Sequence, residues 1–271
     1  MKVIKFIKQK KAIIVADDFT MSEGVDESIS KLLEQNRIHY TSTLVTSDRF
    51  KNLISNAKQI NNIKSKIGLH LDFTFGKAVS IKEKSLITDD NGYFNKGFIH
   101  ILYLSIIKSK QLQSLVAQEI KSQIELLQQI ISTPAHIDGH QHIHMIPLIW
   151  KTLDKINQQY KIPRIRFINE SIFRWQILNI FNIKNTAKLI LLKILGFFCK
   201  NKCDLYFVSI LNTCKISNKI ISTYKVPKKY KKIEIMIHPG DSKIDRNNQS
   251  KERIHLTSKL RDKETRSINI I

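Results

Sequence analysis

Short apolar runs that end abruptly in polar residues recur along the chain, and segments with helical spacing lie between them. The runs predict buried strands at 11–19, 39–46, 66–73, 135–140, 164–167 and 231–240. Apolar spacing of three and four residues predicts helices at 49–61, 111–131 and 147–160, and another helix that begins after the cap residue Ser22. A polar, glycine-containing loop is expected at 76–97. This alternation is typical of α/β proteins with a mainly parallel sheet.

The chain of 271 residues shows no internal repeat and no flexible linker. We therefore expect a single domain spanning 1–271, with an apolar and basic helical insertion at about 172–200. That insertion is rich in Ile, Leu, Phe and Lys. It is expected to pack on the body of the protein, to line a pocket for an apolar substrate, or to lie in a membrane interface.

Polar side chains gather at the predicted carboxyl ends of these strands. They are Asp17, Asp18, His70, Asp138, His140, Arg166 and His238. In α/β barrels and open α/β sheets the active site lies at that end of the strands. The pattern therefore predicts that these residues form one site.

The segment 136–147, HIDGHQHIHMIP, holds four histidines and one aspartate within nine positions. Two histidines and one carboxylate form a common ligand set for a catalytic divalent ion, with positions left for water and substrate. His70, His140 and one aspartate of the Asp17–Asp18 pair could supply this set. The other aspartate could then act as a general base toward water.

Further residues have candidate roles around such a metal. His238 could protonate a leaving amine, and Arg166 could pair with a catalytic carboxylate and lower its pKa. His142 and His144 alternate with His140 along the chain and could face the same cleft, so they could bind substrate or support the metal ligands. Asp138 is a candidate hydrogen-bond partner for an imidazole.

Composition narrows the function classes. The net charge of +22 and the pI near 9.9 favour contact with polyanions, or else reflect a general bias toward Lys, Ile and Asn. We expect no nucleic-acid partner, because no nucleic-acid-binding motif is present. The three cysteines, Cys199, Cys203 and Cys214, are expected to be reduced thiols. We find no signal peptide and no run of 18 apolar residues, so we expect a cytoplasmic protein, with peripheral contact to an anionic membrane as an alternative.

Five segments resemble, in order, the motifs of the YdjC/ChbG-type carbohydrate deacetylases, which include HpnK-like members of hopanoid biosynthesis. The segments are VADDFTMSEGVDESI, GLHLDFTFGKAVS, PAHIDGHQHIHMIP, IPRIRF and EIMIHPGD. The resemblance covers about residues 12–241. It implies a TIM-barrel-like (β/α) fold related to NodB-type deacetylases. It also implies a metal-dependent hydrolase that removes an acetyl group from an N-acetylated amino sugar.

The resemblance also assigns roles to residues. Asp18, His70 and His140 are similar to the ligands of one divalent metal ion, Mg²⁺ or Zn²⁺. Asp17 resembles the catalytic base and His238 the acid. Two positions depart from the family: Thr20 replaces a usual glycine, and Asp72 replaces a neutral residue, often asparagine.

Three questions stay open from the sequence. The substrate could be an oligosaccharide or a lipid-linked sugar, and the protein could form a homodimer. Another barrel metallohydrolase, such as a PHP-like phosphoesterase or an amidohydrolase, is an alternative, although those enzymes usually begin with an H-x-H motif. A non-catalytic glycan-binding or membrane-binding protein is a further alternative.

Overall fold

The computed structural model describes residues 2–55, 60–172, 183–200, 203–247 and 258–268. The chain divides into two compact units, and each is described by itself. Unit 1 consists of residues 1–41, 167–197 and 201–271, and unit 2 consists of residues 42–166 and 198–200. The expected single domain over 1–271 stays a prediction.

Six strands are present in the described part of the chain. They are β1 (Ala12–Phe19), β2 (Tyr40–Thr43), β3 (Ile67–Leu71), β4 (Ile137–Gly139), β5 (Leu205–Val208) and β6 (Lys232–Ile237), in the sheet order β4-β3-β2-β1-β6-β5. The pairs β1–β6, β5–β6 and β3–β4 are all parallel. The predicted α/β class is confirmed. The described residues contribute six strands, whereas a complete (β/α)₈ barrel has eight.

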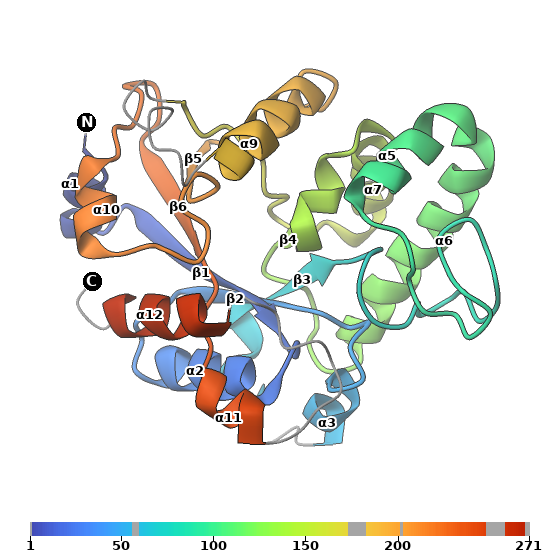
Figure 1. The fold of residues 1–271 in the computed structure, drawn as a ribbon, viewed down its shortest axis with the longest axis horizontal. Coiled ribbons are helices and arrows are strands. Elements are labelled where there is room, and N and C mark those ends of the chain that lie inside the picture. Colours follow the sequence, from blue (N-terminus) through green and yellow to red (C-terminus); the bar gives the residue numbers. More distant parts are fainter. Residues whose placement is uncertain (1, 56–59, 173–182, 201–202, 248–257, 269–271) are drawn as a thin grey trace. The chain divides into compact units, whose positions relative to one another are not determined.

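In unit 1, β6 lies between β1 and β5 (Figure 1). The helices of this unit are α1 (Val3–Lys8), α2 (Glu23–Glu34), α9 (Ile183–Gly196), α10 (Asn218–Thr223), α11 (Ser242–Asn247) and α12 (Ser258–Ile268). As predicted, α2 begins after Ser22, whose hydroxyl accepts the Val25 N–H at 3.4 Å. Almost every residue of β1 is buried, including the two aspartates near its end.

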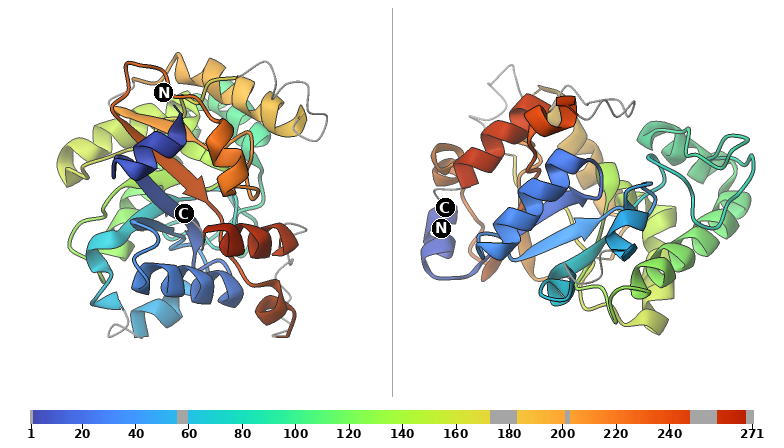
Figure 2. Two further views of the ribbon diagram at one scale, coloured as in Figure 1. Left: turned by 90° about the vertical axis from the view of Figure 1, so that its left-hand side faces the viewer. Right: turned by 90° about the horizontal axis from the view of Figure 1, so that it is seen from below.

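Unit 2 contains the helices α3 (Phe50–Ser55), α5 (Phe98–Ile107), α6 (Ser109–Gln128) and α7 (Pro147–Tyr160), with 3-10 turns at Lys64–Lys66 and His140–Met145. Helix α6 packs against α7, as the green and yellow-green ribbons show in Figures 1 and 2. Its buried face includes Leu112, Val116, Ile120, Ile124 and Leu127. The same face carries Gln123, which binds the backbone N–H and C=O of Asp72 and so fixes the end of β3.

One strand prediction is wrong, and another is correct only in part. Residues 164–167 do not form a strand: the contact is an isolated parallel bridge between Ile137 and Ile165. The partner strand β4 is only three residues long, so a longer β-ladder with residues 164–167 does not form. The predicted strand 135–140 ends at Gly139, because Gln141 and His142 have left-handed φ angles of 53° and 64°. Residues 140, 142 and 144 therefore do not alternate along a strand.

The helix predictions are correct in part. Helix α7 covers 147–160 as predicted, and α6 begins and ends slightly before the predicted 111–131. For the predicted helix 49–61, α3 covers Phe50–Ser55, and residues 56–59 lie outside the described residues. The proposed insertion at 172–200 contains α9, while residues 173–182 lie outside the described residues. Among the described helices, none has the length and apolarity needed to cross a membrane.

Candidate functional site

The carboxylate of Asp138 is the centre of a buried polar network in unit 2. Its Oδ1 lies 2.6 Å from Nδ1 of His70, and its Oδ2 lies 2.7 Å from a guanidinium nitrogen of Arg166. The Ser42 hydroxyl donates to the same Oδ2 at 2.6 Å, and His136 Nε2 lies 3.2 Å from that hydroxyl oxygen. Asp138, His136 and Arg166 have no exposed surface. The network is therefore a fixed scaffold for whatever His70 binds.

Charge pairing keeps Asp138 ionised inside this scaffold. Burial alone raises the pKa of a carboxyl group, but the Arg166 guanidinium and the His70 imidazole hold the pKa of Asp138 well below its usual range. His136 is a neutral member of the network, because burial lowers its pKa to about 4 and the nearby Arg164 acts in the same direction. A carboxylate beside a neutral imidazole is the arrangement that orients metal-binding histidines.

His70 and His140 lie side by side in unit 2. Their ring centroids are 5.5 Å apart, with one ring edge toward the other, and the His140 ring also lies 5.9 Å from Phe75. The Asp138 contact makes Nδ1 of His70 the protonated nitrogen, so the Nε2 lone pair of His70 is the one that can face a metal. This buried Asp/His cluster could hold a metal ion through its two imidazoles, with Asp138 as the orienting carboxylate.

The two later histidines of the motif lie in different surroundings. His144 is fully buried, its Nε2–H donates to the Arg166 carbonyl oxygen at 3.1 Å, and its ring lies 6.4 Å from that of Trp150. Burial lowers the pKa of His144 to about 3, so it is neutral. His142 is 4% exposed. The position of His144 suits support of the Arg166 segment, and the predicted substrate contacts of His142 and His144 stay predictions.

Asp72 organises the loop after β3. Its two carboxylate oxygens accept hydrogen bonds from the Thr46 hydroxyl and from the N–H groups of Thr74 and Phe75, at 2.8 to 3.0 Å. Burial raises the pKa of Asp72, and the charge of the nearby His140 acts in the opposite direction. The carboxylate therefore fixes this loop close to His140.

The aspartate pair lies in unit 1, at the carboxyl end of β1. Both side chains are buried, with exposed fractions of 1% for Asp17 and 2% for Asp18. Asp18 has a left-handed φ of 73°, and Thr20 has a φ of 74°. Glycine adopts such angles without strain, whereas aspartate and threonine adopt them at a cost. The chain thus turns sharply where its acidic groups are presented.

Two cations from late in the chain face these acids. A guanidinium nitrogen of Arg261, on α12, lies 2.5 Å from Oδ2 of Asp18. Burial lowers the pKa of Lys188, on α9, while the charges of Asp18 and Asp17 act in the opposite direction. The segment that the sequence marked as an apolar insertion therefore places a lysine within electrostatic reach of the acidic pair.

His238 follows β6 directly, and its backbone N–H donates to Oε2 of Glu264 at 2.7 Å. Oε1 of Glu264 accepts the N–H of Ile216 at 2.9 Å. Glu264 is buried, which raises its pKa to about 7 although these two hydrogen bonds and Arg261 act against the rise. Glu264 thus holds the end of β6 to the segment after β5 within unit 1.

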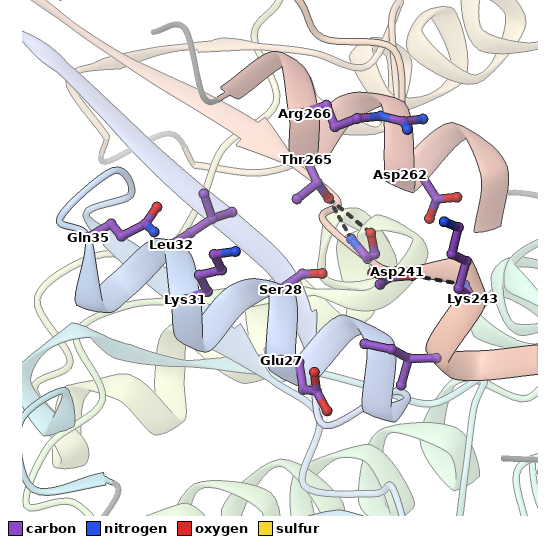
Figure 3. Close-up of a pocket in the computed structure, with 12 residues that line it drawn as sticks. Glu27, Ser28, Lys31, Leu32, Gln35, Asp241, Lys243, Asp262, Thr265 and Arg266 are labelled. Atoms are coloured by element: carbon purple, nitrogen blue, oxygen red, sulfur yellow. Dashed lines mark hydrogen bonds between the residues drawn. The ribbon is translucent and has the colours of Figure 1, made fainter. Parts of the chain in front are cut away.

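A separate hollow of unit 1 has a volume of about 290 Å³ and lies between α2, α11 and α12 (Figure 3). Its lining mixes charges of both signs, including Glu27, Lys31 and Asp262. Thr265 bonds the N–H and C=O of Gly240 at its wall, at 2.9 and 3.1 Å. None of the predicted site residues lines this pocket, so we assign it no role in the chemistry.

The predicted pairing of Asp138 with an imidazole is confirmed by its contact with His70, whereas the partners of the aspartate pair and of His238 were not predicted. Arg261 and Glu264 were missed because α12 lies far along the chain and carries no motif. Lys188 was counted only as one of several insertion lysines. The one local signal in α12 is a pair of buried charged residues in a polar helix. Arg261 lies three residues before Glu264.

Comparison with known proteins places this arrangement in a family. A carbohydrate deacetylase of Clostridium beijerinckii is 26% identical over 236 residues, covering 86% of this chain and 83% of the relative. A carbohydrate deacetylase of Vibrio parahaemolyticus is 30% identical over 154 residues, covering 56% of this chain and 57% of that relative.

A solved structure from Enterococcus faecalis V583, described as a candidate cellobiose-phosphate cleavage protein, has a TM-score of 0.57 at 21% identity. The match covers 95% of this chain and 92% of the solved chain, and it supports the fold. The family model for YdjC-like proteins matches residues 11–268. Nearly the whole length is matched, including every predicted site residue, so the chain belongs to the YdjC-like family.

Proposed function

We propose that the protein is a metal-dependent hydrolase that removes the acetyl group from an N-acetylated amino sugar. Family membership supports this reaction, since the relatives above are named carbohydrate deacetylases. The observation that carries it is the Asp138 network, which orients His70 beside His140 in the way that metal-binding imidazoles are held.

In this proposal Asp18, His70 and His140 hold one divalent ion, and each offers one ligand atom. The residues fit such an ion, because two imidazole nitrogens and a carboxylate oxygen suit Zn²⁺ and leave positions for water and substrate. Mg²⁺ is the alternative, since a carboxylate and water suit it. When bound, the ion polarises the amide carbonyl and makes water more acidic.

The protein's own groups then move the protons. Asp17 accepts a proton from the attacking water, and His238 donates a proton to the departing sugar nitrogen, so acetate and a free amine leave. Arg166 acts through Asp138 rather than on the substrate, because it holds the carboxylate that orients His70. Arg261 pairs with Asp18, so it sets the direction of that carboxylate.

The Asp17→Asn variant separates metal binding from the hydrolytic reaction. The variant should keep one metal ion per chain and release acetate at least about 100-fold more slowly, because amide nitrogen cannot accept the proton. Asp18→Asn, the neighbouring control, should lose metal as well as turnover. The assay is acetate release from N-acetylated sugars, free and lipid-linked, with the metal varied.

The same assay separates the alternatives. Release of phosphate instead of acetate would indicate a phosphoesterase. An Asp17→Asn variant as active as the parent would contradict the assigned base, and lack of turnover with any metal would favour a glycan-binding or membrane-binding protein.

For the substrate we propose a lipid-linked or glycolipid sugar. Helix α9 buries Leu189, Leu192 and Leu195 on one face and exposes Ile190 and Ile194 on another. Lys193 lies beside these apolar residues, and the chain carries a net charge of +22. An apolar surface with neighbouring lysines suits the edge of an anionic membrane. A homodimer stays a prediction.

A further inference from the structure

Three chemically different side chains meet in unit 1, each from a different element. Cys214 lies in the turn after β5, His238 follows β6, and Glu264 lies on α12. One potential ligand atom from each residue lies within 4.8 Å of the other two. Cys214 and Glu264 are buried and His238 is half-buried.

Sulfur, imidazole nitrogen and carboxylate oxygen form a ligand set of the zinc type. Zinc binds these atoms at roughly 2.0 to 2.3 Å, so two ligands in a tetrahedral site lie about 3.3 to 3.7 Å apart. All three ligand atoms lie within 4.8 Å of one another, so they need to approach by at most about 1.1 to 1.5 Å to form a closed site. Side-chain rotation of that size is enough to close the three groups around an ion.

The backbone around the three groups is held in place. Glu264 accepts the N–H of Ile216 with one oxygen and the N–H of His238 with the other, at 2.9 and 2.7 Å. It thereby joins the segments that carry the other two ligands. Each carboxylate oxygen has a second lone pair, which can bind an ion. Cys214 has a left-handed φ of 57°, a conformation that non-glycine residues adopt at a cost.

Charge balance is compatible with a cation. Exchange of the thiol proton for Zn²⁺ adds only one positive charge to the cluster, and Glu264 and the nearby Asp17 are acidic. The positive charges of Arg261 and Lys188 disfavour a bound cation, since both lie within electrostatic reach of Cys214. Arg261 is paired with Asp18, which reduces its opposition.

We propose that Cys214, His238 and Glu264 form a second divalent-cation site, selective for Zn²⁺ over Mg²⁺ because of its sulfur ligand. The site is separate from the proposed ligand set of Asp18, His70 and His140. Resting on the proposed function, we further infer that filling this site inhibits the hydrolase. His238 cannot donate a proton from a ring nitrogen that is ligated to zinc.

Cobalt substitution tests the site without any assay of activity. Co²⁺ added to the metal-free full-length protein should produce the near-ultraviolet charge-transfer absorption of a thiolate–Co²⁺ bond. The proposed hydrolytic set has no sulfur, so this absorption reports on the new site alone. Zn²⁺ should abolish the absorption by competition, whereas Mg²⁺ should leave it unchanged.

Cysteine variants decide which sulfur is involved. Cys214→Ser should abolish the absorption and weaken this Zn²⁺ binding by more than about 10-fold. Cys203→Ser, the matched control at a half-buried cysteine, should behave as the parent. Absence of the absorption from the parent, or its persistence in Cys214→Ser, would overturn the proposal.

Two further measurements cover remaining outcomes. If Cys214→Ser does not fold, zinc-edge X-ray absorption of the parent should find one sulfur ligand, and its absence would overturn the site. Excess Zn²⁺ should inhibit acetate release in the parent and spare a folded Cys214→Ser variant. If no acetylated sugar is turned over, the cobalt result still stands, and only the inhibitory consequence fails.

Discussion

At the scale of single residues, the candidate site depends on the buried carboxylate of Asp138. Asp138 pairs simultaneously with His70 and Arg166 in a region that solvent does not reach. Removal of one partner from such a buried ionic group leaves another charge without compensation. Orientation of the metal ligand and stability of unit 2 are thereby linked through one carboxylate.

Asp138→Asn tests this link. Loss of the charge should weaken metal binding by roughly 10- to 100-fold, because the His70 ring loses its orienting partner. It should also lower the free energy of unfolding by about 3 kcal/mol, because Arg166 keeps its charge in a buried position. Metal titration and urea unfolding measure the two effects. The control is Asp90→Asn, which changes an exposed aspartate of the same unit. Asp90 forms an ion pair with Lys84 at 3.5 Å. Parent-like behaviour of Asp138→Asn in both measurements would refute the link.

At the scale of secondary-structure elements, close packing of β3 on the histidine motif limits which residues the strand can carry. Gly68 lies in β3, and a Cβ atom at this position would be 2.4 Å from the His136 ring. His136 cannot move aside easily, since its ring is buried beside Ser42 and Asp138. A glycine is therefore required for the strand and the scaffold to approach each other.

Gly68→Ala should lower the free energy of unfolding by about 2 kcal/mol or more, because the methyl group overlaps a fixed ring. Gly97→Ala is the matched control: a Cβ at Gly97, before α5, meets no atom within 4 Å. It should change the free energy by less than about 1 kcal/mol. Urea unfolding compares the two variants, and equal effects would argue against the packing constraint.

At the scale of the whole molecule, charge and exposed apolar surface both suit the proposed contact with an anionic membrane. The chain carries 45 basic and 23 acidic residues. Apolar side chains of α9 stay exposed, including Ile190 at 45% and Ile194 at 50%. Long-range attraction brings a cationic protein to an anionic surface, and apolar side chains then contribute short-range binding.

The full-length protein should therefore sediment with vesicles that contain anionic lipid and not with neutral vesicles, and added salt should weaken this binding. Replacement of Ile190 and Ile194 by serine should reduce it several-fold. The matched control replaces Ile99 and Ile106, which are exposed on α5, and should leave it nearly unchanged. Equal binding to both kinds of vesicle, or none to either, would remove the membrane from the proposal.

The sequence by itself determined the α/β class and five of the six strands, because buried parallel strands are short apolar runs that end in polar groups. It also located the acidic pair and the histidine motif. It did not locate β5, and it predicted a strand at 164–167 that is only one bridge. The hydrophobic pattern of a segment indicates that it is buried. Whether the segment forms a strand also depends on a neighbouring strand that is long enough to form a ladder of hydrogen bonds with it.

Tertiary structure alone decided which groups act on the predicted residues. Arg166 binds Asp138, and Asp18 is paired with Arg261, 243 positions away. The left-handed turn at 141 and 142 places His144 against the backbone carbonyl of Arg166. Ion pairs depend on distances between side chains in space. For residues far apart along the chain, those distances are set only when the chain folds.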